Sequence, residues 1–373
     1  MKKVLYVLHD SSYKGANRSF IDYLLTDVEK DATVVFPISE DNELANILKD
    51  HDIPFARFKI HADYYRHFSF KLLIKQKFLY KHFLKEEIDQ IDNLVGHNFD
   101  IVHSNSLTCI VGALFAQNFS IPHVWHAREF LAEDFGMTYF DPDLVFNHLM
   151  PNSNMIFITQ AIKEKFVKYG SLHHEVILNG IADNSLPKQP HSGTNMMIAG
   201  SLTAGKGQTE AIEAVNELIK EHYDIYLHIF GEGEDDAKLK KLVKELNIEK
   251  RVIFHGFAKN LFEERRKMDI ALVCSKREAL GRVTIESMYA GNFVIGADTG
   301  GTKELIGRDN LHGLLYHQGD YRDLVSKIKL VIEHKIDTRP ILAAAKIFAL
   351  STFSPVVCYQ HISEFYDKIV DKK

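Results

Sequence analysis

Two glutamates eight positions apart, Glu278 and Glu286, form the most informative pair of potentially reactive side chains in this sequence. Gly281 lies between them, and the apolar run 270–274 before them is typical of a buried strand. A glycine there lets the backbone turn sharply, so that free amides at the start of the next helix can face an anion. One carboxylate in the loop and one on the helix suit two hydroxyl-rich groups, such as a sugar ring and a ribose. Solvated glutamates on a capped surface helix would show the same pattern, and for the pair alone that is the commoner case.

A glycine-rich segment places Lys206 between a predicted strand at 196–200 and a predicted helix at 207–221. A lysine there could neutralise a phosphate group, because its ammonium is a flexible point charge. The spacing is close to that of the phosphate-binding loop of nucleoside triphosphatases. That loop needs a Ser or Thr after its lysine to hold magnesium, which Gly207 cannot do, so we do not expect an NTPase. For Lys206 alone, a solvated residue early in a helix is the alternative.

Short apolar runs alternate with amphipathic segments along the chain, which is typical of parallel sheets flanked by helices. Because 373 residues exceed the usual size of one hydrophobic core, we expect an α/β protein of two Rossmann-like, doubly wound domains that face a cleft. Ligands of such sheets bind at the carboxyl ends of the strands. The predicted division is an N-terminal domain at 1–181, a polar, proline-containing linker at 182–196, a C-terminal domain at 197–352, and a helix within 353–373 that packs back on the N-terminal domain.

The predicted elements follow this alternation. In the N-terminal domain the strands are 3–8, 32–37, 100–103, 122–126, 155–158 and 175–178, and the helices are 16–26, 41–50, 70–94, 107–118 and 160–169. In the C-terminal domain the further strands are 225–230, 252–255, 270–274 and 293–296, and the further helices are 235–246, 282–290 and 320–334.

Several short motifs of the C-terminal half stand in the order found in one enzyme family. They are Asn-Gly-Ile at 179–181, the strand and Lys-Gly loop at 198–207, the strand and Gly-x-Gly turn at 227–233, Val-x-Phe-x-Gly-Phe within 251–257, Glu-x7-Glu at 278–286, and Gly-Gly-x-x-Glu within 299–304. Each motif is weak alone, but the ordered set is specific. It resembles the glycosyltransferase group 1 family, which comprises glycogen-synthase-like, retaining enzymes of the GT-B fold.

The resemblance implies a nucleotide-sugar site in the C-terminal domain and an acceptor site in the N-terminal domain. Lys206 would neutralise the donor diphosphate, Glu278 would contact the transferred sugar, and Glu286 would accept hydrogen bonds from the ribose. The other expected donor-binding residues are Gly15, Ser201, Gly256, Phe257, Ala279, Leu280, Gly281 and Arg282. Ser201 stands where the family usually has an arginine, so a cation from elsewhere is expected, with Arg282, Arg277 and Arg18 as candidates.

The N-terminal half resembles the family less closely. Gly15 keeps the second glycine of the family's Gly-Gly-Ala-Glu-Arg segment, whereas Lys14 and Asn17 replace the first glycine and the glutamate. His126 closes a predicted strand and resembles the family's active-site histidine near the sugar, so it is expected to be catalytic together with Lys206 and Glu278. His103 also closes a strand and is expected to be a hydrogen-bonded structural residue.

Composition argues against several other classes. A charged fraction of 25% and a hydrophobic fraction of 46% are typical of a soluble globular protein, and a net charge of −5 argues against nucleic-acid binding. The three cysteines are too few and too far apart to indicate a disulfide framework or a zinc site. The apolar run 4–8 is too short for a signal peptide or a membrane span, so a cytoplasmic location is expected. Asp-x-Asp at 50–52 and at 141–143 follows no convincing strand; both are expected to be turns or helix ends, and no metal or other cofactor is expected.

Residues 57–85 carry eight Lys or Arg against the single acid Asp63, with aromatic residues between them. Such a segment suits the surface of an anionic membrane, which would place the protein at the inner face of the membrane. The alternative is a long helix whose aromatic residues pack on its own domain while its lysines are solvated.

The expected function is transfer of a sugar, with retention and without a metal, from a nucleotide-diphosphate donor to a glycan or lipid-linked acceptor of the cell envelope or surface. Two alternatives stay open. The first is a non-catalytic nucleotide-sugar-binding partner subunit, because Lys14 and Ser201 depart from the family pattern. The second is a sugar-nucleotide epimerase, which can share the same architecture.

Overall fold

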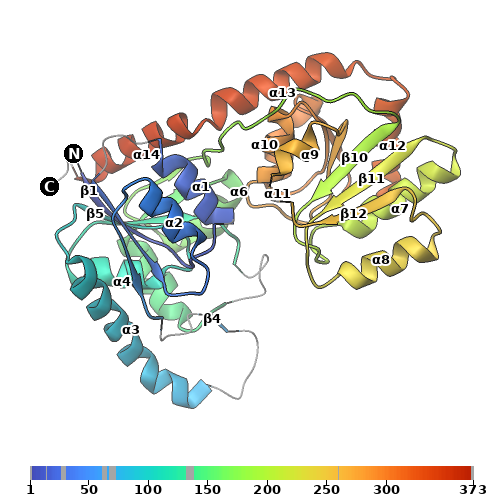
Figure 1. Ribbon diagram of the computed structural model, residues 1–373. Helices are drawn as coiled ribbons and strands as arrows, with labels where there is room; N and C mark the ends of the chain where they lie inside the picture. Colours follow the sequence, from blue (N-terminus) through green and yellow to red (C-terminus); the bar gives the residue numbers. More distant parts are fainter. Residues whose placement is uncertain are drawn as a thin grey trace. The chain divides into compact units, whose positions relative to one another are not determined.

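A computed structural model describes residues 2–13, 15–26, 31–60, 65–66, 73–131, 138–258 and 260–370. The chain divides into two compact units (Figure 1). Unit 1 comprises residues 1–180 together with 355–373, and unit 2 comprises residues 181–354. The prediction of two Rossmann-like α/β domains with parallel sheets is confirmed, because each unit is built on one such sheet.

The sheet of unit 1 has seven parallel strands in the order β3-β2-β1-β5-β6-β8-β9. The strands are β1 (Lys3–Val7), β2 (Asp31–Pro37), β3 (Phe55–Phe58), β5 (Ile101–Ser104), β6 (His123–Ala127), β8 (Asn154–Phe157) and β9 (His174–Val176). The strand order reverses between β1 and β5, so the loops after these strands diverge and leave room for polar side chains at that edge. β1 lies in the middle of the sheet, which explains its unbroken apolar run.

The helices of unit 1 are α1 (Gly15–Leu24), α2 (Glu43–Asp50), α3 (Leu73–Val95), α4 (Ile110–Asn118), α6 (Gln160–Phe166) and α14 (Pro355–Val370). Unit 1 also contains a short antiparallel pair, β4 (Tyr65–Arg66) with β7 (Thr138–Tyr139), a π-helix (Leu144–Leu149) and two 3-10 helices (Met150–Asn152 and Val167–Tyr169). The C-terminal helix α14 lies beside α1 (Figure 1). It contributes Cys358, Ile362, Phe365 and Tyr366 to the core around β1.

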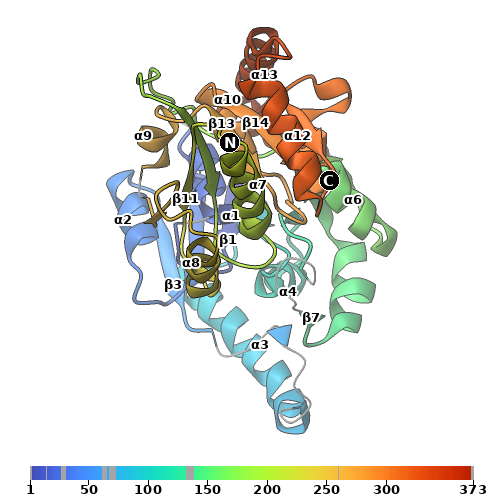
Figure 2. The ribbon, with the colours of Figure 1, turned by 90° about the vertical axis from the view of Figure 1, so that its right-hand side faces the viewer.

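The sheet of unit 2 has six parallel strands in the order β12-β11-β10-β13-β14-β15. The strands are β10 (Thr194–Ala199), β11 (Ile225–Phe230), β12 (Val252–Gly256), β13 (Ile270–Val273), β14 (Phe293–Ala297) and β15 (Leu314–Tyr316). The helices are α7 (Gln208–Lys220), α8 (Asp236–Glu245), α9 (Leu261–Arg265), α10 (Arg282–Tyr289), α11 (Gly300–Ile306), α12 (Tyr321–Ile332) and α13 (Thr338–Thr352). α7 and α12 pack side by side (Figure 2) and bury the main core of this unit with the sheet.

Several boundaries differ from the predicted ones. The predicted linker at 182–196 is too long, because residues 194–196 already pair with β11 and β13 as the start of β10. Strands β3 and β15 and helices α9, α11 and α13 were not predicted. All five are short except α13, whose apolar residues lack a clear helical stripe, with only Ala345 and Ala349 fully buried.

The two Asp-x-Asp motifs end or begin helices, as predicted. Asp50 is the last residue of α2, and Asp52 adopts φ +53° in the turn that follows. Asp141 accepts a hydrogen bond from the amide of Leu144 at 3.1 Å, and Asp143 directly precedes the π-helix.

The basic aromatic stretch 57–85 falls partly outside the described residues. Of the aromatic residues that are described, Phe58 and Tyr80 are buried in unit 1, so the packed alternative is correct for these two. Lys81 and Lys85 are exposed on α3. Within the described part of the chain, no single helix is long and apolar enough to span a membrane; α13 and α14 meet that criterion only as a bent pair, by length and composition.

Candidate active site

The loop between β13 and α10 carries the predicted Glu278 and packs against the glycine-rich loop after β10. The amide of Lys276 donates to the carbonyl of Gly205 at 2.8 Å. Gly207 adopts φ +73°, and a Cβ there would lie 2.1 Å from the carbonyl oxygen of Cys274, so only glycine fits. Because β10, β13 and β14 are neighbours in the sheet, the loops at their carboxyl ends meet at one edge of unit 2, where the strand order reverses.

Lys206 and Glu278, predicted on separate loops, form an ion pair. The Nζ of Lys206 lies 2.6 Å from Oε1 of Glu278, and the hydroxyl of Ser275 donates to the same oxygen at 2.6 Å. The two side chains are 31% and 19% exposed, so both can be reached by a ligand. The pair therefore presents one cation and one carboxylate side by side at this edge of the sheet.

Two helices begin beside this loop. Gly281 caps α10 with φ +86°, and the amide of Gly301 in α11 donates to the carbonyl of Glu278 at 2.8 Å. The Oγ1 atoms of Thr284 and Thr302 are buried and have no hydrogen-bond partner among the described residues. A Cβ on Gly281 would lie 3.2 and 3.7 Å from these two oxygens. The hydroxyls and the amides at the start of α10 are donors of the kind that bind phosphate oxygens.

The backbone of Ala279 and Leu280 is held against α11. A Cβ on Gly301 would lie 2.8 and 2.7 Å from their carbonyl oxygens, so the loop can pack this closely only on glycine. The side chain of Leu280 is buried. The backbone is therefore the part of Leu280 that can offer a contact to a donor.

Glu286 is buried on α10 between two arginines. The Nη2 of Arg265 lies 2.8 Å from its Oε2, and the Nε of Arg282 donates to its Oε1 at 3.0 Å. Arg265 is fully buried, so the pair is shielded from solvent. A carboxylate oxygen can accept more than one hydrogen bond, so the two arginines do not by themselves prevent Glu286 from accepting one from a hydroxyl group.

The remaining predicted donor residues of unit 2 border the same edge of the sheet. Ser201 is exposed after β10, and its carbonyl accepts a hydrogen bond from the side chain of Gln208 at 2.9 Å. Gly256 ends β12 with φ +66°, and Phe257 after it is 58% exposed. An exposed aromatic ring at this position could contact a planar base.

The candidates for the missing cation lie in different places. Arg277 is exposed in the loop that carries Glu278, and Arg282 holds Glu286. Arg18 lies on α1 in unit 1, as does Gly15, which begins that helix with φ +47°. Within unit 2, Arg277 and Arg282 are thus the arginines that the loop after β13 brings to the predicted donor site.

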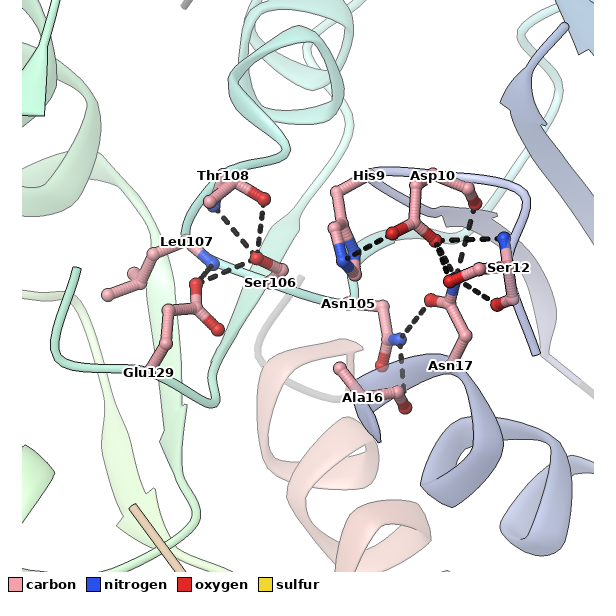
Figure 3. A network of polar contacts seen from close by, with 10 residues as sticks. All are labelled: His9, Asp10, Ser12, Ala16, Asn17, Asn105, Ser106, Leu107, Thr108 and Glu129. Atoms are coloured by element: carbon pink, nitrogen blue, oxygen red, sulfur yellow. Dashed lines mark hydrogen bonds and ion pairs between the residues drawn. The ribbon is translucent and has the colours of Figure 1, made fainter. Parts of the chain in front are cut away.

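Unit 1 has a polar network of its own at the carboxyl ends of β1 and β5 (Figure 3). The Nε2 of His9 lies 3.3 Å from Oδ2 of Asp10, and Asn17 donates to Oδ1 of Asp10 at 2.6 Å. Burial alone would lower the pKa of His9, but the hydrogen bond and charge of Asp10, with the charge of Glu129, raise it above its ordinary value. Although burial acts the other way, His9 and Ser12 hold the pKa of Asp10 below its ordinary value.

Two charged residues follow β6 and, unlike His9 and Asp10, are buried. Glu129 accepts hydrogen bonds at 2.7 Å from the hydroxyl of Ser106 and from the backbone amide of Leu107 (Figure 3). Arg128 donates from Nε to Oδ1 of Asn105 at 2.9 Å, and its Nη1 bonds to the side chain of Asn179. These bonds fix the guanidinium and the carboxylate at the same edge of the sheet.

His126 is the last polar residue of β6 and is fully buried. Burial lowers its pKa well below the ordinary value, and Arg128 and His103 lower it further, so the ring is neutral near pH 7. His103 is, as predicted, a buried and hydrogen-bonded residue: its Nδ1 lies 2.5 Å from the Oη of Tyr366, and its Nε2 lies 3.2 Å from Nδ1 of His126.

Several residues of these two sites were not predicted from the sequence. They are His9, Asp10, Asn105, Arg128, Glu129 and Tyr366 in unit 1, and Arg265 and Ser275 in unit 2. The position of His9 and Asp10 directly after β1 was a usable signal, since strand ends in such sheets carry ligand-binding residues. Arg265 and Tyr366 could not be found that way, because they reach the sites from helices distant in sequence. Among the described residues, no group of three or more His, Cys, Asp or Glu side chains is arranged to hold a metal ion.

Residues 187–346, which contain Lys206, Glu278 and Glu286, match the family model described as glycosyl transferases group 1. This part of the chain resembles the group 1 glycosyltransferases. Solved structures with a similar fold include that of Anabaena HepE in complex with UDP-glucose, with a TM-score of 0.79, 22% identity, and coverage of 99% of this chain and 100% of that one. Sucrose-phosphate synthase from Thermosynechococcus elongatus has a TM-score of 0.77 at 16% identity, with all of both chains covered. The predicted GT-B fold is confirmed.

The curated relatives match this chain mostly over part of their length. The N-acetylgalactosamine-N,N'-diacetylbacillosaminyl-diphospho-undecaprenol 4-alpha-N-acetylgalactosaminyltransferase of Campylobacter jejuni is 28% identical over 50% of this chain and 50% of its own length. The lipopolysaccharide core biosynthesis glycosyltransferase LpsE of Rhizobium meliloti is 29% identical over 40% of this chain and 43% of its own. An uncharacterised glycosyltransferase of Methanocaldococcus jannaschii is 24% identical over 89% of this chain and 88% of its own length. The chain thus spans about half the length of the first of these relatives.

Proposed function

We propose that this protein moves a sugar from a nucleotide-diphosphate donor to a glycan or lipid-linked acceptor in the synthesis of envelope or surface polysaccharide. The observation that carries the proposal is the cradle in unit 2, where Lys206, Glu278 and the start of α10 gather at the carboxyl ends of three neighbouring strands. The names of similar proteins support the choice of substrates: HepE was crystallised with UDP-glucose, and the Campylobacter and Rhizobium relatives are named for undecaprenol-linked and lipopolysaccharide substrates.

The chemical problem is the departure of a nucleoside diphosphate from an oxocarbenium-like carbon. The electron pair of the breaking C–O bond stays on the diphosphate, and its new negative charge needs a donor or cation close by. In this proposal the ammonium of Lys206 and the amides at the start of α10 supply it, so that no metal ion is required. The acceptor hydroxyl attacks the same face of the sugar and passes its proton to the departing phosphate oxygen, which retains the configuration.

The acceptor is assigned to unit 1, whose strand ends carry the partly exposed His9 and Asp10 and the buried Arg128 and Glu129. Paired carboxylates and a guanidinium held in fixed orientations suit a target rich in hydroxyl groups. A lipid-linked acceptor would also give a role to the exposed lysines 81 and 85 of α3, which we assign to contact with an anionic membrane.

The test is a thermal-shift screen of nucleotides and nucleotide sugars followed by product analysis. A true donor binds the folded state and raises the Tm by mass action, whereas the matching sugar without its nucleotide leaves the Tm unchanged. Incubation of that donor without acceptor should release free sugar and nucleoside diphosphate slowly. No release would indicate a binding subunit, and an altered sugar still joined to the nucleotide would indicate an epimerase. Activity lost on chelation and restored by magnesium would overturn the metal-free mechanism.

A further inference from the structure

A buried chain of hydrogen bonds in unit 1 runs from the C-terminal helix to His126. It includes Tyr366 on α14, whose Oη lies 2.5 Å from Nδ1 of His103 and also hydrogen-bonds with Tyr6 and Tyr23. The Nε2 of His103 lies 3.2 Å from Nδ1 of His126, and the Nη2 of Arg128 also lies 3.2 Å from that nitrogen. All four side chains are at least nine-tenths buried. Solvent therefore has little access to these bonds.

The direction of these bonds follows from the one member that can only donate. A guanidinium carries five N–H groups and no acceptor, so Nδ1 of His126 must offer its lone pair to Arg128. If Nδ1 carried the proton instead, two N–H groups would face each other in a buried place. The Nε2 of His103 then donates to the same lone pair. The Nδ1 of His103 then accepts from the phenol of Tyr366, which stays protonated because burial raises the pKa of Tyr366 well above its ordinary value.

The proton of His126 is thereby assigned to Nε2. Burial keeps the ring neutral, and Nδ1 is occupied as an acceptor, so Nε2 carries the one N–H. This nitrogen is buried and has no hydrogen-bond partner among the described residues. A buried donor without a partner is unfavourable, which makes an oxygen atom of a ligand its natural acceptor.

We propose that Tyr366, acting through His103 and together with Arg128, fixes His126 as the Nε2–H tautomer, so that His126 serves sugar transfer as a hydrogen-bond donor and not as a base. The use of this donor by a substrate oxygen rests on the proposed function; the tautomer itself does not. Tyr366 and His103 are positioning residues, because they act on the substrate only through His126. The C-terminal helix is thus part of the active site of unit 1.

The tautomer is tested without any substrate by NMR of protein labelled with ¹⁵N-histidine. The chain has 20 histidines, so the signals of His126 are assigned as those lost in His126→Gln. We expect Nε2 of His126 to show the shift of a protonated nitrogen and Nδ1 that of an unprotonated one throughout pH 6–8. Tyr366→Phe removes only the hydroxyl and should shift both histidines towards mixed tautomers. Tyr359→Phe removes a hydroxyl from the same helix and should change neither.

Activity gives a second readout, measured as release of UDP from UDP-glucose or from whichever donor the thermal-shift screen selects. Tyr366→Phe should lower kcat about fivefold with KM for the donor unchanged, as for the loss of one supporting hydrogen bond. His126→Gln keeps an N–H near the position of Nε2 and should retain more activity than His126→Leu; a base could not be replaced in this way.

The outcomes separate the two proposals. His126 protonated on Nδ1, or Tyr366→Phe indistinguishable from Tyr359→Phe in its histidine spectrum, would overturn the tautomer assignment. If the spectrum is as expected but no donor is turned over, the proposed function fails and the assignment stands. If the donor is turned over and His126→Gln is as inactive as His126→Leu, the role as a donor is overturned.

Discussion

The ammonium of Lys206 and the carboxylate of Glu278 form an ion pair at 2.6 Å. In the proposed mechanism, however, Lys206 contacts the diphosphate of the donor and Glu278 contacts its sugar. An incoming diphosphate must therefore share Lys206 with Glu278. The pair holds the lysine in place before the donor arrives, which lowers the entropy lost on binding. The same carboxylate repels the diphosphate. Glu278 should therefore weaken the binding of the nucleotide while it supports the transfer of the sugar.

Replacement of Lys206 by alanine should lower kcat by roughly a hundredfold, because the leaving diphosphate loses its nearest cation in the transition state. The measurement is the rate of nucleoside diphosphate release at saturating donor. Lys220→Ala, an exposed lysine at the end of α7, serves as the control and should turn over normally. Equal kcat in both variants would remove Lys206 from the mechanism.

Glu278→Gln should bind UDP more tightly than the wild type, by about fivefold, because a negative charge close to the diphosphate is gone. The same variant should lose most of its transfer activity, since the proposed contact to the sugar is weakened. Isothermal titration with UDP checks the first part, with the exposed Glu249→Gln as a control. Weaker binding in Glu278→Gln would show that the carboxylate supports the lysine more than it opposes the phosphate.

Arg265→Met should destabilise the protein by about 3 kcal/mol, because it leaves the buried Glu286 with Arg282 as its remaining cation in this cluster. The loss is measured by urea denaturation. The neighbouring Arg266 is more exposed, and its substitution by methionine should cost well under half as much. Similar losses in the two variants would mean that the buried ion pair stabilises the protein no more than an exposed one does.

Stability should fall as the pH drops below about 6.5, and His123 should be one cause. Burial lowers the pKa of His123 from 6.5 to about 3, so between these values the unfolded chain binds the proton that the folded protein does not. Unfolding is therefore favoured as the pH falls through this window, by about 2 kcal/mol at pH 5 for this residue. The lowered pKa values of His126 and of His228, the latter about 4, act with the same sign.

Denaturation at pH 5 and pH 7.5 measures this effect. His123→Gln should flatten the difference between the two conditions even if it lowers stability at both. The exposed His361→Gln should leave the difference as it is in the wild type. An unchanged slope in His123→Gln would show that the ring is not the group that titrates.

The assignment of α3 to a membrane surface predicts binding to vesicles that contain anionic phosphatidylglycerol. Reversal of two exposed charges, in Lys81→Glu/Lys85→Glu, should weaken binding at low salt by at least roughly 30-fold, since each basic residue near such a surface contributes about 1 kcal/mol. Co-sedimentation measures it, with Lys238→Glu/Lys241→Glu in unit 2 as the matched control. Equal loss in both variants would indicate attraction by overall charge alone.

Local patterns in the sequence were enough to predict the sheets and the residues at their edges. The apolar run of β1 and the glycines around Lys206 and Glu278 predict strands, turns and helix starts within a few residues of where they lie. Contacts between distant segments were not predictable in this way. Arg265 reaches Glu286 from the five-residue helix α9, and Tyr366 reaches His103 across 263 positions of the chain. No periodic pattern in the sequence predicts either contact, because each contact depends on how the elements pack.

Unit 2 is one uninterrupted stretch of chain, whereas unit 1 is completed only by α14 after the whole of unit 2. During synthesis the ribosome therefore makes residues 181–354 before Ile362 and Phe365 exist to cover the core beside β1. Until then the first 180 residues expose an apolar surface, so we expect them to need chaperones on the nascent chain. For the same reason, a premature stop codon near the end of the gene would damage the half of the protein that is translated first.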